Sequence, residues 1–263
     1  MFFKYKVLYW VCGAICVGTA SFAGNLSLYS FTEGAADQGM TNITSGDENV
    51  AIGDEALKLN TSGSYNTAVG DEALKANTIG VKNTAIGKGS LYSNTSGQQN
   101  VGIGFEALKS NTTGGYNTAV GVEASRSNSS GILNTSVGFE SLETNTSGSY
   151  NTAVGGRALR YNSGSYNTAV GSDALVANTG GEKNAAIGTD SMYSNTTGKY
   201  NDASGYQSLY SNTTGTFNAD GTPGSLDNET PTFSTPHRPH RRGRLRERQP
   251  RGKLGFVYAQ VHD

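Results

Sequence analysis

Cysteine and histidine are almost absent from this chain of 263 residues. The two cysteines, Cys12 and Cys16, lie in an apolar N-terminal segment, and the three histidines, His237, His240 and His262, lie near the C-terminus. The long stretch between them therefore has no thiolate or imidazole for metal binding, and no cysteine nucleophile or histidine general base. We expect no catalytic residue, no cofactor and no metal site, and predict that the protein is not an enzyme.

Large aliphatic residues and net charge are also scarce. Leu, Ile, Val and Phe together are too few for an ordinary globular core, which by composition alone is typical of disorder. Disordered chains usually also carry a high net charge, whereas the formal net charge here is −1. The few apolar residues recur at fixed intervals, and this regularity favours an ordered repeat.

A unit of 17 residues accounts for most of the chain. Its consensus is N-T-A-(V/I)-G-x-(E/D)-(A/S)-L-x-x-N-T-(S/T)-G-x-Y, and ten such units follow one another without a gap. The units begin at Asn49, Asn66, Asn83, Asn100, Asn117, Asn134, Asn151, Asn167, Asn184 and Asn201, and a degraded unit begins at Asn218. Only the unit at Asn151 is one residue shorter. A fixed short period predicts a solenoid whose coils stack on their neighbours.

Each unit contains two short apolar stretches, which we interpret as two extended segments. In T-A-V-G the β-branched residues alternate with small ones, as in a strand, and E-A-L-K-x-N is too short for a stable helix. The first stretch supplies a column that begins with Ile52, Val69 and Ile86, and the second supplies a column that begins with Leu57, Leu74 and Leu91. Stacked at about 4.8 Å per coil, the two columns predict one narrow core.

Glycine and asparagine mark the two predicted corners of each coil. The glycine column begins with Gly53, Gly70 and Gly87, and we expect positive φ or close backbone approach there. The asparagine column includes Asn60, Asn77, Asn94, Asn111, Asn128 and Asn145, whose side chains can bond their own turn and the neighbouring coils. Many of these asparagines are also formal glycosylation sequons, but turn chemistry alone requires this spelling.

The thin core predicts self-association. Two large apolar side chains per coil contribute roughly 3–6 kcal/mol, well below the cost of ordering 17 residues. The small-residue columns, which begin with Ala51, Ala68 and Ala85, would allow a second chain to approach closely. An acidic column that begins with Glu55 and Glu72 could gather cations, although one carboxylate per coil is more typical of a solvated face.

The chain divides into five segments. Residues 1–23 have the basic start, apolar run and small residues of a secretory signal peptide, and 24–48 are expected to cap the repeats. The β-roll is predicted over 49–217 and its degraded final unit over 218–230. Residues 231–263 form a basic, Arg/Pro-rich segment. We interpret that segment as a disordered tail or a reading-frame slip, with an arm for anionic partners as the alternative.

The repeated (N/S)-x-A-(V/I)-G element resembles the head repeats of YadA-like trimeric autotransporter adhesins over about residues 42–230, and the unit from Asn201 to Phe217 resembles a 17-residue variant of bacterial surface proteins. They are also similar to repeats of phage-type tail fibres. The resemblance implies a left-handed parallel β-roll, three copies packed around one axis, and a role in cell adhesion. Adhesins of this family continue into a stalk and a membrane anchor. We expect neither here, so a partner would have to supply the anchor.

Three functions agree with the sequence. The first is a secreted or cell-surface adhesin that binds host, matrix or cell surfaces through many similar coils, with a matrix component or glycan as ligand and no nucleic acid at the repeats. The second is a passive shaft or spacer. The third is an ice- or carbohydrate-binding face built on the threonine column that includes Thr67, Thr84 and Thr118, which Val50, Val101, Ala185 and Asp202 interrupt.

Overall fold

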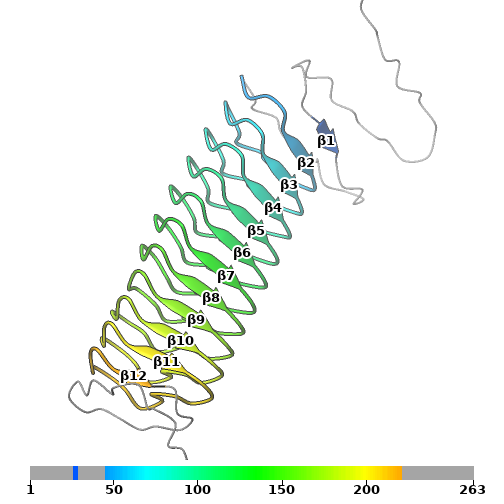
Figure 1. Ribbon diagram of the computed structural model, residues 1–263. Coiled ribbons are helices and arrows are strands. Elements are labelled where there is room, and N and C mark those ends of the chain that lie inside the picture. The colour runs from blue at the N-terminus through cyan, green and yellow to red at the C-terminus, as the bar shows by residue number, and fades with distance from the viewer. Residues whose placement is uncertain (1–25, 29–44, 221–263) are drawn as a thin grey trace, which may run out of the picture. The chain divides into compact units, whose positions relative to one another are not determined.

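The protein is an all-β parallel solenoid of about nine 17-residue turns, which confirms the predicted fold class (Figure 1). The computed structural model describes residues 26–28 and 45–220. The predicted signal peptide over 1–23 and the basic tail over 231–263 lie outside the described residues. So do most of the predicted capping segment and most of the degraded final unit.

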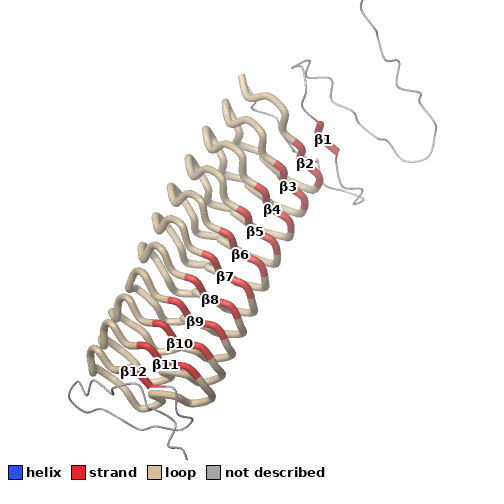
Figure 2. Tube along the Cα trace, in the orientation of Figure 1, coloured by secondary structure: helices blue, strands red, loops and turns tan. Residues whose placement is uncertain are grey.

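Each coil contributes one short strand to a single 12-stranded parallel sheet, whose strand order follows the chain order from β1 to β12. The strands lie on one side of the coils, and the rest of each coil consists of turns and loops (Figure 2). In-register pairing places Thr67 beside Thr84 and Ala68 beside Ala85. The strands are β1 (Leu26–Leu28), β2 (Val50–Ile52), β3 (Thr67–Val69), β4 (Thr84–Ile86), β5 (Val101–Ile103), β6 (Thr118–Val120), β7 (Thr135–Val137), β8 (Thr152–Val154), β9 (Thr168–Val170), β10 (Ala185–Ile187), β11 (Asp202–Ser204) and β12 (Ala219–Asp220).

The second predicted extended segment is wrong, because that side of each described coil is a run of turns. In the first unit the N–H of Ala56 donates to Gly53 O at 3.3 Å, and the same spacing recurs twice before the asparagine corner. Leu57 has a φ of 52°, in the left-handed region that no strand uses. The turns still bond to the next coil, since Leu57 N–H donates to Ala73 O at 3.0 Å. Strand geometry is therefore not needed to satisfy these backbone groups.

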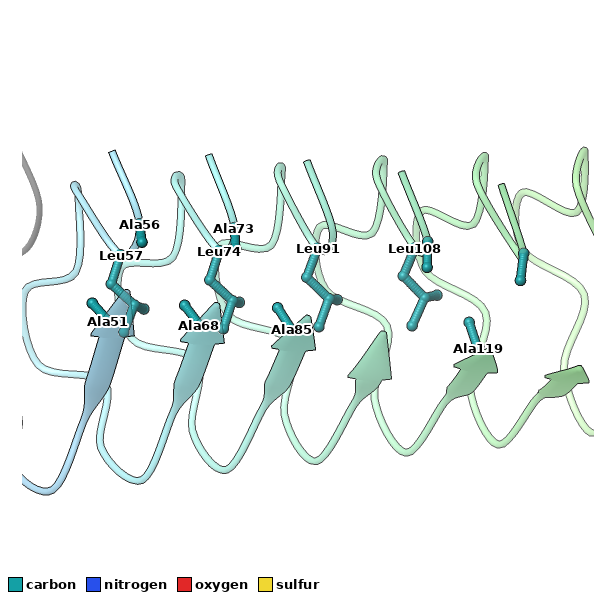
Figure 3. Packing of buried hydrophobic residues seen from close by; sticks show 12 residues of the cluster. Ala51, Ala56, Leu57, Ala68, Ala73, Leu74, Ala85, Leu91, Leu108 and Ala119 are labelled. Carbon is teal, nitrogen blue, oxygen red and sulfur yellow. The ribbon is translucent and has the colours of Figure 1, made fainter. Parts of the chain in front are cut away.

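The leucine column forms the core, and it packs against the alanines of the strands. Leu57 and Leu74 are completely buried, as are Ala68 and Ala73, and Ala51 is 1% exposed. Leu57 and Ala51 point toward one another across the interior of the coil, and the same pair recurs as Leu74 with Ala68 and as Leu91 with Ala85 in the next two coils (Figure 3). Each coil therefore buries one large apolar side chain together with small ones, except the coil in which Ser125 replaces the leucine.

The valine and isoleucine column does not line this core, contrary to the sequence prediction. Ile52 and Ile86 are 37% and 40% exposed, and Val69 is intermediate. The sequence predicts the alternation along each strand correctly, but it places valine and isoleucine on the inner side. In the structure alanine lies on the inner side, because the interior beside leucine has room only for a small side chain. For the same reason Ala51 and its counterparts cannot admit a second chain, since their own coil covers them.

The glycine corner has the two properties expected of it. Gly53, Gly70 and Gly87 have φ values of 130°, 135° and 123°, which disfavour any residue with a Cβ. A Cβ on Gly87 would also lie 2.5 Å from the carbonyl oxygen of Gly104 in the next coil. The coils approach so closely at this corner that both conformation and space require glycine.

Candidate functional site

The predicted asparagine column is a continuous ladder of hydrogen bonds inside the solenoid. Asn77 Nδ2 donates to Asn60 Oδ1 at 2.7 Å, and Asn94 Nδ2 donates to Asn77 Oδ1 at 2.8 Å. Each side chain also closes its own turn, as Asn77 Nδ2 does with Gly80 O at 3.1 Å. Because amide groups of adjacent coils satisfy each other, the column can be buried without the cost of an unpaired polar group. The ladder continues through Asn111, Asn128 and Asn145.

A second asparagine ladder, formed by the residue that opens each unit, was not assigned a role from the sequence. Asn49 Oδ1 accepts from the backbone N–H of Asn66 at 3.0 Å and from its side-chain Nδ2 at 3.1 Å. Asn66 Nδ2 also donates to Gly80 O at 2.9 Å. This bond joins the second ladder to the asparagine corner that carries the first ladder. The signal that could have revealed this ladder is the invariance of Asn at the first position of every unit.

These ladders bear directly on the sequons. Asn60, Asn94 and Asn111 each begin an N-T-(S/T) triplet, yet all three are completely buried and their side chains are hydrogen-bonded within the ladder. A glycan attached to any of them would require that coil to open. In the folded solenoid the triplets therefore serve turn formation, as the sequence analysis favoured.

The outward side of the sheet, here called the sheet face, is uncharged in its central part. It consists of the outward residues of the strands, together with the residue two positions before the first residue of each strand and the residue two positions after its last residue. Across β5 to β9 none of these positions carries a charged side chain. Its most exposed large side chains in this region are Phe105, Tyr116, Val122, Leu133, Phe139, Tyr150 and Tyr166, each 43–55% exposed. With a length of about 24 Å over five strands, this central region covers roughly 500 Å², near the upper limit for an isolated monomer.

Aromatic rings along one margin of the sheet face stack on one another. The ring centroids of Tyr150 and Tyr166 lie 4.8 Å apart at an interplanar angle of 4°, and those of Tyr200 and Phe217 lie 4.9 Å apart. Lys183 Nζ lies 4.9 Å from the centroid of the Tyr200 ring. Each stacked ring covers a face of its neighbour. A ligand would therefore meet mainly ring edges and hydroxyl groups in these stacks.

Charged residues concentrate on the turns between the glycine and asparagine corners, here called the turn side. Glu106 Oε1 lies 2.6 Å from Lys109 Nζ in its own coil, and Glu106 Oε2 lies 2.8 Å from Arg126 Nε in the next coil. Arg160 similarly contacts Glu143 at 2.6 Å and Glu140 at 3.1 Å. The acidic column predicted from the sequence is thus largely paired with bases.

The ion pairs shift the pKa values of their members. Hydrogen bonds from Lys58 and Lys75 lower the pKa of Glu55 below its ordinary value of 4.5. Lys109 and Arg126 likewise lower the pKa of Glu106, and their effect exceeds that of burial, which alone would raise it. The hydrogen bonds of Lys75 with Glu55 and Glu72 raise the pKa of Lys75. All these shifts favour the charged state.

The described residues contain no group of three or more His, Cys, Asp and Glu side chains placed to hold a metal ion. They also contain no helix long and apolar enough to cross a membrane. The chemistry that the described coils do offer is repetitive: a sheet face that is uncharged in its central region, a charged turn side and two buried amide ladders. No protein-family model, no curated protein and no solved structure matches this chain.

Proposed function

We propose that this protein is a secreted or cell-surface adhesin-like rod that binds matrix, glycan or cell surfaces through many similar coils. The observation that supports this proposal best is the segregation of its exposed side chains. The central region of the sheet face, across β5 to β9, is uncharged and exposes Val, Ile, Tyr and Phe, whereas the turn side carries ion-paired Glu, Lys and Arg. A rod with two such different sides can associate through one and display the other.

The sheet face is the surface through which copies associate in this proposal. Its central strands expose aliphatic and aromatic side chains and carry no charge that would have to be desolvated or paired. Stable interfaces bury about 800 Å² per partner, which is more than the central region offers, so the interface would extend over the coils on either side of it. A homotrimer, as the resemblance to YadA-like heads implies, would cover the sheet face of each copy. The contact surface replaces the alanine columns to which the sequence analysis assigned it.

The turn side then remains available for ligands. Each coil places similar polar groups about 4.8 Å from those of the next coil, so a repetitive partner can contact many coils at once. Contacts that are weak at one coil become useful when effective concentration along a rigid array couples them. Extracellular matrix polymers and surface glycans have the repetitive polar chemistry that such an array suits.

A passive shaft is the second candidate, and one observation favours it. The positions that never vary among the ten units are the two asparagines, the corner glycine and the glycine that ends the asparagine turn, and all four have structural roles. Exposed positions do vary: the residue after the corner glycine is Asp54, Lys88, Phe105 or Tyr206 in different coils. Variation at every exposed column is what a spacer selected for length would permit.

Association through the sheet face can be tested by light scattering of the mature chain with and without Val137→Lys and Val154→Lys. We expect the unchanged chain to be an oligomer and the double variant to dissociate, because a buried, unpaired charge is costly. Ser130→Lys adds the same charge at an exposed residue of the turns outside the sheet face and should leave the oligomer intact. A folded monomer for the unchanged chain at micromolar concentration would contradict the proposed assembly.

Binding can be tested by retention of rods with three, six and ten coils on surfaces coated with matrix proteins or glycans. An adhesin should be retained with steeply increasing strength as coils are added, and no single exposed substitution should abolish retention. Absence of retention at every length would leave the passive shaft as the better proposal. Retention lost only on removal of residues 231–263 would place the binding element in the basic tail.

A further inference from the structure

We infer that the rod is built as two cooperative halves joined by a weaker seam, so that it opens at residues 134–150 before either half unfolds. This inference rests on the fold alone and holds for an adhesin and a shaft alike. In a stack of coils each coil contacts only its neighbours, and stability is close to a sum of terms for the interfaces between them. The interface with the smallest sum therefore decides where a long stack divides.

The first observation is an interruption of the apolar core. One cluster of buried apolar residues runs from Ala51 to Ala124 and a separate one from Leu142 to Leu209. At the boundary Ser125 occupies the position that leucine or methionine holds in the other nine units, and it is 2% exposed. The coil at this point lacks the only large side chain that its interior normally contains.

A second serine accompanies this change. Ser136 stands where the strands of the neighbouring coils have alanine, and it is completely buried. Ser125 Oγ donates to Ser136 Oγ at 2.8 Å, so the two hydroxyl groups are paired across the boundary between the coils. The pair makes the substitution tolerable but replaces apolar packing by one neutral hydrogen bond, whose net contribution is only about 1 kcal/mol.

The interface between residues 134–150 and the unit that begins at Asn151 is weakened by a different feature. In earlier coils the N–H groups of the asparagine turn donate to a carbonyl of the following coil; those of Thr61, Ser62 and Gly63 all reach Thr78 O at 3.0–3.2 Å. Among the described residues, the corresponding N–H groups of 146–148 make no hydrogen bond. The following unit is the one shortened by a residue, and the missing residue falls in its asparagine turn.

The asparagine ladder also lengthens at the seam. Its side-chain bonds are 2.7–2.8 Å between successive members from Asn60 to Asn128. The bond from Asn145 to Asn128 is 3.2 Å and that from Asn162 to Asn145 is 3.1 Å, and the next one returns to 2.7 Å. At the asparagine corner, residues 134–150 thus have longer ladder bonds on both sides than any coil of the first half.

The seam gives the rod a defined response to heat or pulling. A uniform stack would fray from its ends inward, because each end coil has only one neighbour. In this stack the amides in the middle should instead lose their protection against hydrogen exchange while the strands on both sides stay paired. Opening there would leave two folded halves that can close again on one another.

Hydrogen exchange of the full-length mature chain tests the inference. Amides that bond across the seam, such as Ser125 N–H to Ser141 O and Thr144 N–H to Arg160 O, should exchange on the order of tenfold faster than their counterparts in the two halves. Leu74 N–H, which donates to Ser90 O, and Leu175 N–H, which donates to Ser191 O, are the references. Uniform protection from coil to coil, or protection that falls only toward the ends, would overturn the inference.

The double variant Ser125→Leu with Ser136→Ala restores the consensus. It should slow exchange of the residue 125 amide, which bonds to Ser141 O, to the rate of the reference amides of Leu74 and Leu175. The matched control is Ser191→Ala with Ser208→Ala, which removes a buried serine pair, 3.1 Å apart, where the leucine column is intact. This control should leave exchange at the seam unchanged. If the double variant does not alter seam exchange, or both variants alter it equally, the core interruption is not its cause. The exchange profile of the unchanged chain decides the matter even if the double variant does not fold.

Discussion

Asn77 donates one side-chain hydrogen bond to Asn60 Oδ1 in the preceding coil and another to Gly80 O in its own turn. The same carboxamide therefore closes its corner and joins two coils. This dual use explains why a solenoid with one large apolar side chain per coil can hold its backbone in place. It also makes the buried amides about as sensitive to substitution as the small core.

Asn94→Ala should reduce the free energy of unfolding by about 3 kcal/mol or more. The change removes the bonds that Asn94 makes to Asn77 and Gly97, and it leaves Nδ2 of Asn111 without the acceptor Oδ1 of Asn94. An unsatisfied buried polar group costs about 1–3 kcal/mol, and more than one is created here. Chemical denaturation followed by circular dichroism measures the loss. Gln98→Ala, at an exposed position of the same coil, should have almost no effect, and equal losses would argue against the ladder.

Gly87→Ala should be strongly destabilising, whereas Gly156→Ala should be nearly neutral. A Cβ at Gly87 would meet the Gly104 carbonyl oxygen at 2.5 Å, and the φ of 123° adds strain. An added Cβ at Gly156 has no heavy atom within 4 Å. Melting temperatures of the two variants compare a required glycine with a replaceable one. Similar temperatures would contradict the close approach of the coils at the corner.

Leu74→Ala should cost about 2–5 kcal/mol, the usual range for emptying a buried leucine site. Leu74 is completely buried, and neighbouring coils cannot move into the space without breaking their ladders. The control is Ile79→Ala, since Ile79 is 57% exposed and should contribute less than about 1 kcal/mol. Denaturant midpoints of both variants test this difference. A larger effect at Ile79 than at Leu74 would mean that the core has been assigned to the wrong column.

Stability should fall as the pH drops below about 4.5, the ordinary pKa of the glutamates concerned. The pKa values of Glu55 and Glu106 are lowered in the folded state. Near these pKa values the folded chain therefore binds fewer protons than the unfolded chain does. Their contribution is present above the unfolded pKa and is lost as the pH falls through the folded pKa. Melting temperatures between pH 7 and pH 3 should show this decline, and Glu55→Gln with Glu106→Gln should flatten it. Because these pairs are partly exposed, added salt should reduce the effect. An unchanged slope in the double variant would assign the acid sensitivity to other groups.

The sequence determined the repeat, the stacking direction and both corners of the coil. A period of 17 residues permits only a stack in which residue 60 lies beside residue 77, and an invariant Asn or Gly at such a position predicts a ladder or a turn. The leucine column could be assigned to the core for the same reason, since one large apolar residue per coil must be buried somewhere.

Only the tertiary structure decided which way each column faces and where the coils hold together less firmly. Alternation in T-A-V predicts two opposite faces, but Ala68 and Val69 could each be the inner one until the space beside Leu74 is known. The turns that replace the second strand depend on positive φ at Leu57, a conformation that leucine does not favour by itself and that bonds to the next coil stabilise. The pairing of Ser125 with Ser136 likewise became visible only when two residues eleven positions apart in sequence were found in contact. In each case the outcome depends on the volume and hydrogen-bonding groups of the neighbouring coil, which local sequence does not specify.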